Sequence, residues 1–212
     1  MVGIYWDCDG TLMDTERAYA YAWQEVLSKR SLNLPIETFD DYVGIDDRLV
    51  HKKYAKEVSL PSFSETMDEI AALIINNFSD HTMYQDSLSC LNYFHDLEWS
   101  QACVSASPQK ALEDKLNKAN ISQYFTFVVG GDVVRPRNKP FPDIYNLAIQ
   151  KLNTTKNIIV EDSPPGIESG KASNNFVVAI DLGIFSKKEL SNADVVVNEL
   201  SPSLFIDISK TL

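Results

Sequence analysis

The chain has 212 residues and a formal net charge of −11, enough material for one large domain or for a medium domain that carries an insertion. The acidic balance argues against broad binding to nucleic acids or anionic membranes, because phosphate groups need a basic surface. No apolar stretch has the length of a membrane span, and nothing resembles a signal peptide. The three scattered cysteines predict neither a disulfide framework nor a zinc cluster. We therefore expect a cytoplasmic protein.

The first predicted element is a short apolar strand, 2–6, which stops at two carboxylates, Asp7 and Asp9. Residues 17–78 then show helical spacing of apolar side chains almost throughout. Ser64 is expected to cap the last helix of this segment. The pattern predicts a small helical bundle inserted directly after the first strand.

From about residue 86 the pattern alternates between helices and strands. Apolar runs rich in β-branched residues predict strands at 102–104, 125–129, 158–160, 176–180 and 195–197. Ser107 and Pro108 are expected to start a helix, with Ser107 as its N-cap. Continuous apolar strands separated by helices are typical of a parallel sheet covered on both faces. The sequence therefore predicts an α/β fold: a Rossmann-like doubly wound parallel sheet, formed by 1–14 and 81–212, with an α-helical insertion at 15–80.

Polar side chains follow four of the predicted strands. They are Asp7 and Asp9 after the first strand, Ser105 after the second, Lys139 in the loop after the third, and Glu161 with Asp162 after the fourth. Ligands of a doubly wound sheet bind at the carboxyl ends of its strands. We therefore expect these side chains to meet at one edge of the sheet.

This set of residues favours metal-assisted phosphoryl transfer. Asp7 and Asp162 offer the hard oxygen ligands that Mg²⁺ takes. Asp7 is also the candidate nucleophile, and Asp9 can protonate the leaving oxygen and later activate water. Lys139 and Ser105 are expected to hold the phosphoryl oxygens. Each feature alone has a simpler explanation, since Asp-x-Asp-Gly is also a common turn composition, but their joint occurrence in this order favours a catalytic site.

Four stretches resemble, in this order, the motifs of the haloacid dehalogenase superfamily, and most closely its phosphatase and β-phosphoglucomutase-like branch. They are DCDGTL at 7–12, VS at 104–105, KPFPD at 139–143 and VEDS at 160–163. The resemblance implies that Asp7 forms an aspartyl-phosphate and that Asp9 is the acid and base. It also implies Mg²⁺ held by Asp7, by the backbone carbonyl of Asp9 and by Asp162, with Glu161 beside these ligands.

The helical insertion resembles the cap of that family, which closes over the site and selects the substrate. The resemblance implies a small phosphorylated metabolite as substrate. Thr11 and Ala106 are candidate contacts in the core unit, and Tyr19 and Arg48 are candidate contacts from the cap, with ordinary packing and a solvated helix face as the alternatives for these two. It says nothing about oligomeric state, and a monomer agrees with it. Neither nucleic acid nor membrane is an expected partner.

These residues distinguish phosphate monoester hydrolysis from two other functions, that of a sugar-phosphate mutase and that of a phospho-acceptor domain. Dehalogenating members of the superfamily lack an acid at the position of Asp9, so Asp9 favours phosphoryl chemistry. Related mutases usually carry a His in the first cap helix, where this chain has Tyr19, so the predicted reaction is hydrolysis of a phosphate monoester such as a sugar phosphate. A sugar-phosphate mutase is the alternative. A phospho-acceptor signalling domain is a third interpretation, but such domains are shorter and carry no large insertion after the first strand.

Overall fold

The computed structural model describes residues 1–42, 47–77 and 82–212. The chain divides into two compact units: Met1–Asp14 with Asp80–Leu212, and Thr15–Ser79. In the described ranges, no helix combines the length and the apolar character that crossing a membrane requires.

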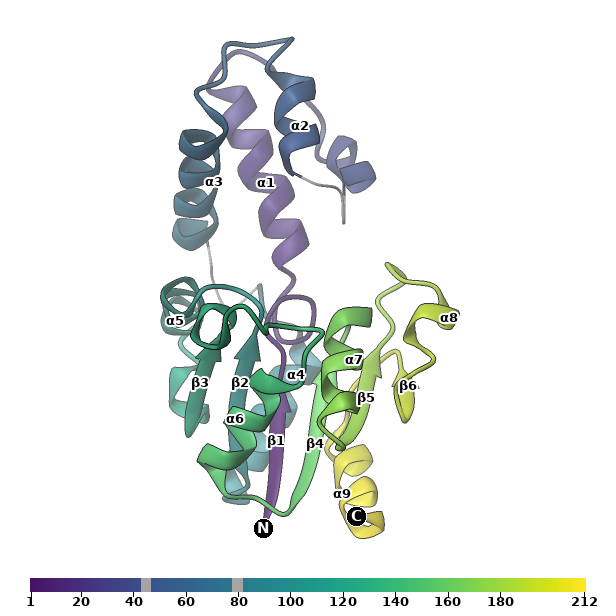
Figure 1. Ribbon diagram of the computed structural model, residues 1–212. Coiled ribbons are helices and arrows are strands. Elements are labelled where there is room, and N and C mark those ends of the chain that lie inside the picture. Colours follow the sequence, from purple (N-terminus) through teal and green to yellow (C-terminus); the bar gives the residue numbers. More distant parts are fainter. Residues whose placement is uncertain (43–46, 78–81) are drawn as a thin grey trace. The chain divides into compact units, whose positions relative to one another are not determined.

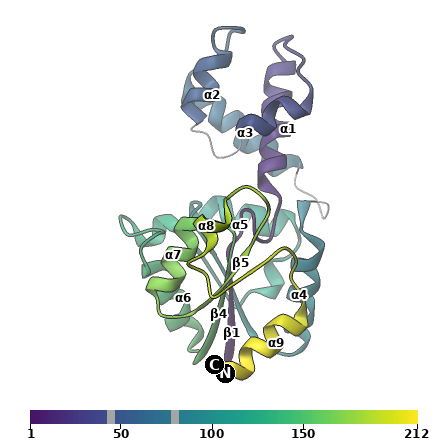
Figure 2. The ribbon, with the colours of Figure 1, turned by 90° about the vertical axis from the view of Figure 1, so that its right-hand side faces the viewer.

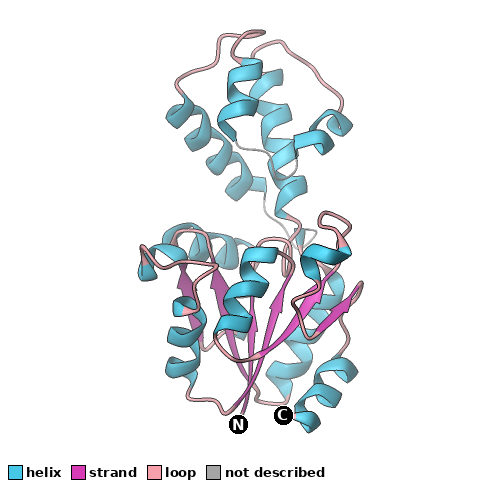
Figure 3. Ribbon diagram, turned by 45° about the vertical axis from the view of Figure 1, so that its right-hand side comes forward, coloured by secondary structure: helices cyan, strands magenta, loops and turns pink. Residues whose placement is uncertain are grey.

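The larger unit is built on a six-stranded parallel sheet with the order β3-β2-β1-β4-β5-β6, and Figure 3 shows its strands pointing the same way. The strands are β1 (Val2–Trp6), β2 (Ser100–Ser105), β3 (Phe127–Gly130), β4 (Lys156–Glu161), β5 (Phe176–Ile180) and β6 (Val195–Val197). This is the strand order of a doubly wound fold, so the predicted fold class is confirmed.

Helices cover both faces of the sheet. They are α4 (Gln85–Asp96), α5 (Gln109–Lys118), α6 (Asp143–Leu152), α7 (Pro164–Ala172), α8 (Lys187–Leu190) and α9 (Pro202–Thr211). Figures 1 and 2 show α6 and α7 on one face of the sheet, with α4 and α9 on the other. Coverage on both faces explains why the central strands are apolar on both sides rather than alternating.

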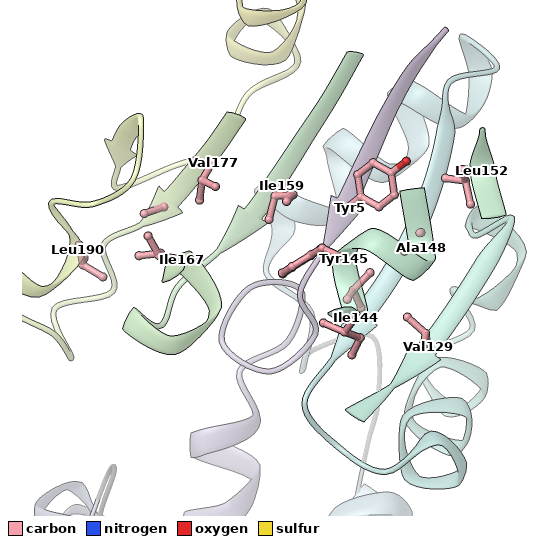
Figure 4. Close-up of a cluster of buried hydrophobic side chains, with 13 residues drawn as sticks. Tyr5, Val129, Ile144, Tyr145, Ala148, Leu152, Ile159, Ile167, Val177 and Leu190 are labelled. Carbon is pink, nitrogen blue, oxygen red and sulfur yellow. The ribbon is translucent and has the colours of Figure 1, made fainter. Parts of the chain in front are cut away.

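The core beneath α6 and α7 fixes these helices to the sheet. Figure 4 shows Ile144 and Ala148 of α6 and Ile167 of α7 beside Tyr5 and Ile159 of the central strands, all five completely buried. Burying an isoleucine side chain such as that of Ile144 contributes about 1.5–3 kcal/mol. Because α6 and α7 start at the carboxyl edge of the sheet, this core also fixes the loops that line that edge.

The strand β3 starts later than its apolar run predicts. The run begins at residue 125, but a 3-10 turn (η3, Ser122–Tyr124) precedes it and the strand begins at Phe127. The backbone N–H of Thr126 already donates to the carbonyl oxygen of Gln101 at 2.8 Å. Phe125 therefore belongs to the turn that brings the chain to the sheet edge.

The second unit contains α1 (Thr15–Ser28), the 3-10 segment η1 (Ile36–Tyr42), α2 (Asp47–Tyr54) and α3 (Phe63–Asn77). Rings of Trp23 and Phe39 lie 6.1 and 6.3 Å from that of Tyr54, which joins α1, η1 and α2 in one apolar core. Arg30, after α1, forms a 2.8 Å ion pair with Glu69 of α3.

The N-terminus of α3 differs from the predicted one. Ser62, not Ser64, caps the helix: its hydroxyl accepts from the backbone N–H of Glu65 at 3.3 Å, and the Glu65 carboxylate accepts from the backbone N–H of Ser62 at 3.0 Å. This reciprocal pair is a capping box, and of the two serines Ser62 and Ser64 only Ser62 has a Glu three residues later.

Candidate active site

The turn after β1 is shaped by Gly10. Its φ is +88°, and a Cβ added there would lie 2.1 Å from Oδ2 of Asp162. The turn is closed by hydrogen bonds from the N–H of Gly10 to the carbonyl of Met13 at 2.8 Å and from the N–H of Leu12 to the carbonyl of Cys8 at 3.0 Å. Glycine is therefore required here both for its backbone conformation and for the close approach of a carboxylate.

Asp7 lies at the end of β1 and forms an ion pair with Lys139. The backbone N–H of Asp7 donates to the carbonyl of Val160 at 2.9 Å, which extends the pairing of β1 with β4 by one residue. The ammonium of Lys139 lies 2.6 Å from Oδ1 of Asp7 and 2.6 Å from Oε1 of Glu161, and it donates to the carbonyl of Val104 at 3.0 Å. Three acceptors thus hold a lysine whose side chain is only 4% exposed.

Glu161 is completely buried at the end of β4 and is held by several donors. The phenol of Tyr145 donates to Oε1 at 2.7 Å, and the hydroxyl of Ser163 donates to Oε2 at 3.1 Å. A Cβ at Gly166 would lie 2.0 Å from the Glu161 carboxyl group, so the first turn of α7 leaves room only for hydrogen there. The carboxylate of Glu161 is therefore fixed by its surroundings.

Three carboxylates at this edge can hold a metal ion. One oxygen from each of Asp7, Glu161 and Asp162 lies within 4.8 Å of the others, and all three residues are buried. Burial, opposed by Lys139 and reinforced by the neighbouring acids, raises the pKa of Asp7 to about 7. Burial and the charges of Asp7 and Glu161 raise the pKa of Asp162 to about 9. Such a cluster is short of positive charge, as a cation site is.

Lys139 keeps its charge in this cluster. Burial by itself would lower the pKa of its ammonium, but the charges of Asp7 and Glu161 raise that pKa well above its usual value. A protonated lysine between two carboxylates leaves the site partly, not fully, neutralised.

Asp9 points to a different set of partners. Its Oδ1 forms an ion pair with the ammonium of Lys115, and its Oδ2 accepts from the hydroxyls of Ser107 at 2.9 Å and Ser105 at 3.3 Å. Asp7 and Asp9 are thus held by two different lysines, from two different parts of the chain.

The expected capping role of Ser107 is wrong. Its hydroxyl donates to Asp9, and the residue preceding α5 is Pro108, without a side-chain cap. The backbone N–H of Gln109, which an N-cap would satisfy, donates to Oδ1 of Asp132 at 2.7 Å. Asp132, in η4 (Gly131–Val134), thus takes the place of a cap at the start of α5. The hydroxyl of Ser107 is therefore available to Asp9.

Thr11 and Ala106 also lie at this edge. The hydroxyl of Thr11 is buried and donates to Oδ1 of Asp162 at 3.3 Å, so Thr11 orients a carboxylate. Ala106 is exposed, and its carbonyl accepts from the side-chain amide of Asn138 at 3.1 Å. The sheet edge thus collects Asp7, Asp9, Thr11, Ser105, Ala106, Lys139, Glu161 and Asp162.

Tyr19 and Arg48 belong to the second unit. The phenol of Tyr19 donates to the sulfur of Met67 at 3.5 Å, and the guanidinium of Arg48 lies 5.6 Å from the centre of the Phe63 ring. Their expected contact with a substrate stays a prediction.

Three residues of this site, Ser107, Lys115 and Tyr145, were missed as site residues by the sequence reasoning. Lys115 lies three residues after the buried Leu112, so helical spacing places it near the buried face of α5, an unusual position for a lysine. Tyr145 follows the same spacing as buried residues of α6 and is indistinguishable from a core aromatic in sequence. The helical pattern thus carries a signal for Lys115 but none for Tyr145.

Comparison with known proteins places the chain in a family. Residues 4–180 match the family described as haloacid dehalogenase-like hydrolase. A phosphorylated carbohydrates phosphatase of Thermotoga maritima is 26% identical over 82% of both chains, and a phosphoglycolate phosphatase of Vibrio cholerae is 26% identical over 90% of this chain and 89% of its own. The crystal structure of a β-phosphoglucomutase from Clostridium difficile superposes with a TM-score of 0.69 and 21% identity, covering 100% of this chain and 98% of the other.

The chain belongs to the haloacid dehalogenase-like hydrolases, since the family match covers most of its length. The predicted family resemblance is therefore confirmed, and with it the prediction that the chain is an enzyme of the hydrolase class. The superposition shows that the fold is shared with a member of the branch that its motifs resemble.

Proposed function

We propose that the chain hydrolyses the phosphate monoester of a small metabolite, with Asp7 as nucleophile and Mg²⁺ as cofactor. The observation that carries the proposal is the position of Asp7: a buried carboxylate held by Lys139 at 2.6 Å, next to Asp162 and two residues before a second acid, Asp9. The relatives named as phosphatases of phosphorylated carbohydrates and of phosphoglycolate support this substrate class.

The donor set fits a hard divalent cation. Asp7 and Asp162 offer buried carboxylate oxygens. Burial, together with the charges of the neighbouring acids, raises their pKa values, and Mg²⁺ would supply positive charge that favours their ionised forms. The backbone carbonyl of Asp9 is the further ligand we propose. Glu161 is engaged by Lys139 and Tyr145, which supports a place beside the ligands. When bound, the ion would neutralise charge on the phosphoryl oxygens.

The residues divide the reaction into two steps. In the first, a carboxylate oxygen of Asp7 forms a bond to phosphorus while the bond to the ester oxygen breaks, and protonated Asp9 gives its proton to the leaving oxygen. In the second, water attacks the aspartyl-phosphate, ionised Asp9 takes the proton of the water, and the bond between phosphorus and Asp7 breaks. The products are an alcohol and inorganic phosphate, and both aspartates return to their initial states.

Lys139 and Ser105 have supporting roles in this proposal. The ammonium of Lys139 keeps Asp7 in place and offsets the negative charge that builds up on the phosphoryl group. The hydroxyl of Ser105, at the end of β2, donates to Asp9 at 3.3 Å, and we propose that it turns to a phosphoryl oxygen when the substrate is bound. It accepts from the backbone N–H of Ser107 at 3.0 Å, which fixes its orientation. Thr11 and Ala106 line the same edge.

We further propose that the helical unit, 15–80 in our assignment, is the cap that selects the substrate, with Tyr19 and Arg48 as contacts. This unit has an apolar core of its own around Trp23, Phe39 and Tyr54, which supports movement as one body. A sugar phosphate or a metabolite of similar size is the expected substrate.

The test is phosphate release from a panel of phosphomonoesters in the presence of Mg²⁺. We expect turnover of at least one ester by the wild type, and its loss in Asp7→Asn, in Asp9→Asn and in EDTA. Phosphate that is retained, together with a requirement for a bisphosphorylated activator, would instead identify a sugar-phosphate mutase. Stable labelling of Asp7 without release would identify a phospho-acceptor domain. Absence of both labelling and release would overturn the proposal.

A further inference from the structure

The carboxylate of Asp9 is held on both of its oxygens. The ammonium of Lys115 pairs with Oδ1, while the hydroxyls of Ser107 and Ser105 reach Oδ2 at 2.9 and 3.3 Å. The Lys115 ammonium also lies 3.4 Å from the Ser107 hydroxyl, so Lys115 and Ser107 form one group around Asp9. This group sets the direction in which the carboxylate points.

Lys115 differs from an ordinary surface lysine. Its side chain is 14% exposed and that of Asp9 is 30% exposed. An exposed ion pair contributes little to stability because water competes for both charges, and water competes less for this partly buried pair. Burial by itself would lower the pKa of Lys115, but Asp9 and its neighbours raise it, so the side chain stays an ammonium. Buried Leu112 and Leu116 anchor α5 on either side of it. The charge therefore has a fixed position.

The donors on the two oxygens of Asp9 are of different kinds. An ammonium has three N–H donors and no acceptor, so it gives Oδ1 a hydrogen bond but cannot accept a proton from that oxygen. A serine hydroxyl can donate or accept by rotating its O–H bond. Oδ2, which faces the hydroxyls of Ser105 and Ser107, is therefore the oxygen whose neighbours can accept a hydrogen bond when it holds the proton.

We infer that Lys115 is a positioning residue for Asp9: it fixes Oδ1 and so makes Oδ2 the oxygen that gives and takes the proton. The inference rests on the proposed phosphatase function, in which Asp9 is the acid and base. Lys115 acts through Asp9 and does not contact the phosphoryl group.

The test compares two kinds of ester, because only one of them needs an acid. An alkyl phosphate leaves as an alkoxide and needs the proton of Asp9, whereas 4-nitrophenyl phosphate leaves as a stable phenolate. In Lys115→Met, kcat/KM for the best alkyl phosphate of the panel is expected to fall about 100-fold, as for a misplaced catalytic group. KM for the alkyl phosphate should stay within about 2-fold, and kcat/KM for 4-nitrophenyl phosphate should fall less than about 5-fold. This ratio reports only the steps up to departure of the leaving group, and not the later attack of water in which Asp9 is the base. Lys115→Arg should recover most of the loss.

Two controls separate positioning from other roles. Lys110 lies on the same helix, is 81% exposed and pairs with Asp114, so Lys110→Met should leave both kinetic constants unchanged. If Lys115 acts through Asp9, adding Lys115→Met to Asp9→Asn should not reduce the single-turnover release of 4-nitrophenol any further, since that release does not need the proton of Asp9.

Several outcomes would overturn the inference. Equal losses on both esters with a raised KM would make Lys115 a substrate contact, and unchanged kinetics would make it structural. If the wild type released phosphate from no ester, the proposed function itself would fail. A crystal structure of Lys115→Met then decides the positioning: the inference requires the Asp9 carboxylate to turn away from Ser107, and an unmoved carboxylate contradicts it.

Discussion

The phenol of Tyr145 donates a 2.7 Å hydrogen bond to Oε1 of Glu161, and the two residues are completely buried. The same oxygen accepts from Lys139 at 2.6 Å, and Lys139 in turn holds Asp7 at 2.6 Å. A helix residue that the sequence marks as core thus supports the proposed nucleophile through two buried charges. The site depends on α6 as much as on the strand ends.

Tyr145→Phe is expected to reduce both stability and activity. The substitution removes one donor from a buried carboxylate, which costs about 1–3 kcal/mol of unfolding free energy. We expect kcat to fall about 10-fold because Glu161, which holds Lys139, is then less firmly fixed itself. Urea denaturation and steady-state kinetics measure the two effects. Tyr93→Phe is the matched control: Tyr93 is 44% exposed on α4, and losing its hydroxyl should change neither quantity.

Gly10→Ala is expected to abolish Mg²⁺ binding and activity, because the new methyl group would lie 2.1 Å from Oδ2 of Asp162. Gly183 provides the control, since its φ is +79° and a methyl group added there would have no atom within 4 Å. Gly183→Ala should therefore cost only the left-handed backbone strain, about 1–2 kcal/mol, and leave activity intact. Calorimetric titration with Mg²⁺ compares the two. Equal Mg²⁺ affinity in both variants would rule out the steric explanation.

The metal-free protein is expected to lose stability as the pH rises. Burial raises the pKa of Asp7 to about 7 and that of Asp162 to about 9, from an ordinary value of 3.8. Between the ordinary and the raised values the native state binds more protons than the unfolded state, so the free energy of unfolding falls with increasing pH. Binding of Mg²⁺ favours the ionised carboxylates, so its stabilising effect should grow over the same range.

Urea denaturation in EDTA and in Mg²⁺, from about pH 5 to about pH 9, measures this dependence. Asp162→Asn should flatten the decrease seen in EDTA, because it removes one of the two carboxyl groups. A metal-free protein that gained stability toward alkaline pH would contradict the prediction.

The cysteines are expected to be unreactive in the native protein. Cys8, Cys90 and Cys103 are all buried; a hydrogen bond with Cys103 together with burial raises the pKa of Cys8 well above its usual value, and burial raises that of Cys90 to about 12. Thiolate is the reactive form. Native protein treated with 5,5′-dithiobis(2-nitrobenzoate) should release almost no chromophore, and unfolded protein should release three equivalents. Rapid labelling of Cys8 in the folded enzyme would contradict this.

Much of the fold follows from local sequence. Runs of apolar β-branched residues, such as 158–160 and 176–180, alternate with helices, and this pattern predicts the buried strands of a parallel sheet covered on both faces. Because parallel strands present their carboxyl ends at one edge, the sequence also indicates that Asp7, Lys139 and Glu161 come together there. The spacing of Ser62 and Glu65 is by itself the signature of a capping box, although the helical pattern first suggests Ser64 as the cap.

The partners of individual polar groups required the tertiary structure. The sequence determined that residues directly after a strand, such as Asp7 and Glu161, reach the carboxyl edge of the sheet, because strands are set by local pattern. It did not determine that Ser107 turns to Asp9, since that depends on Asp132 arriving from η4 to satisfy the start of α5. Nor did it join Lys115 to Asp9, because helical spacing gives the face of a side chain, while its partner depends on how the helix packs against the sheet.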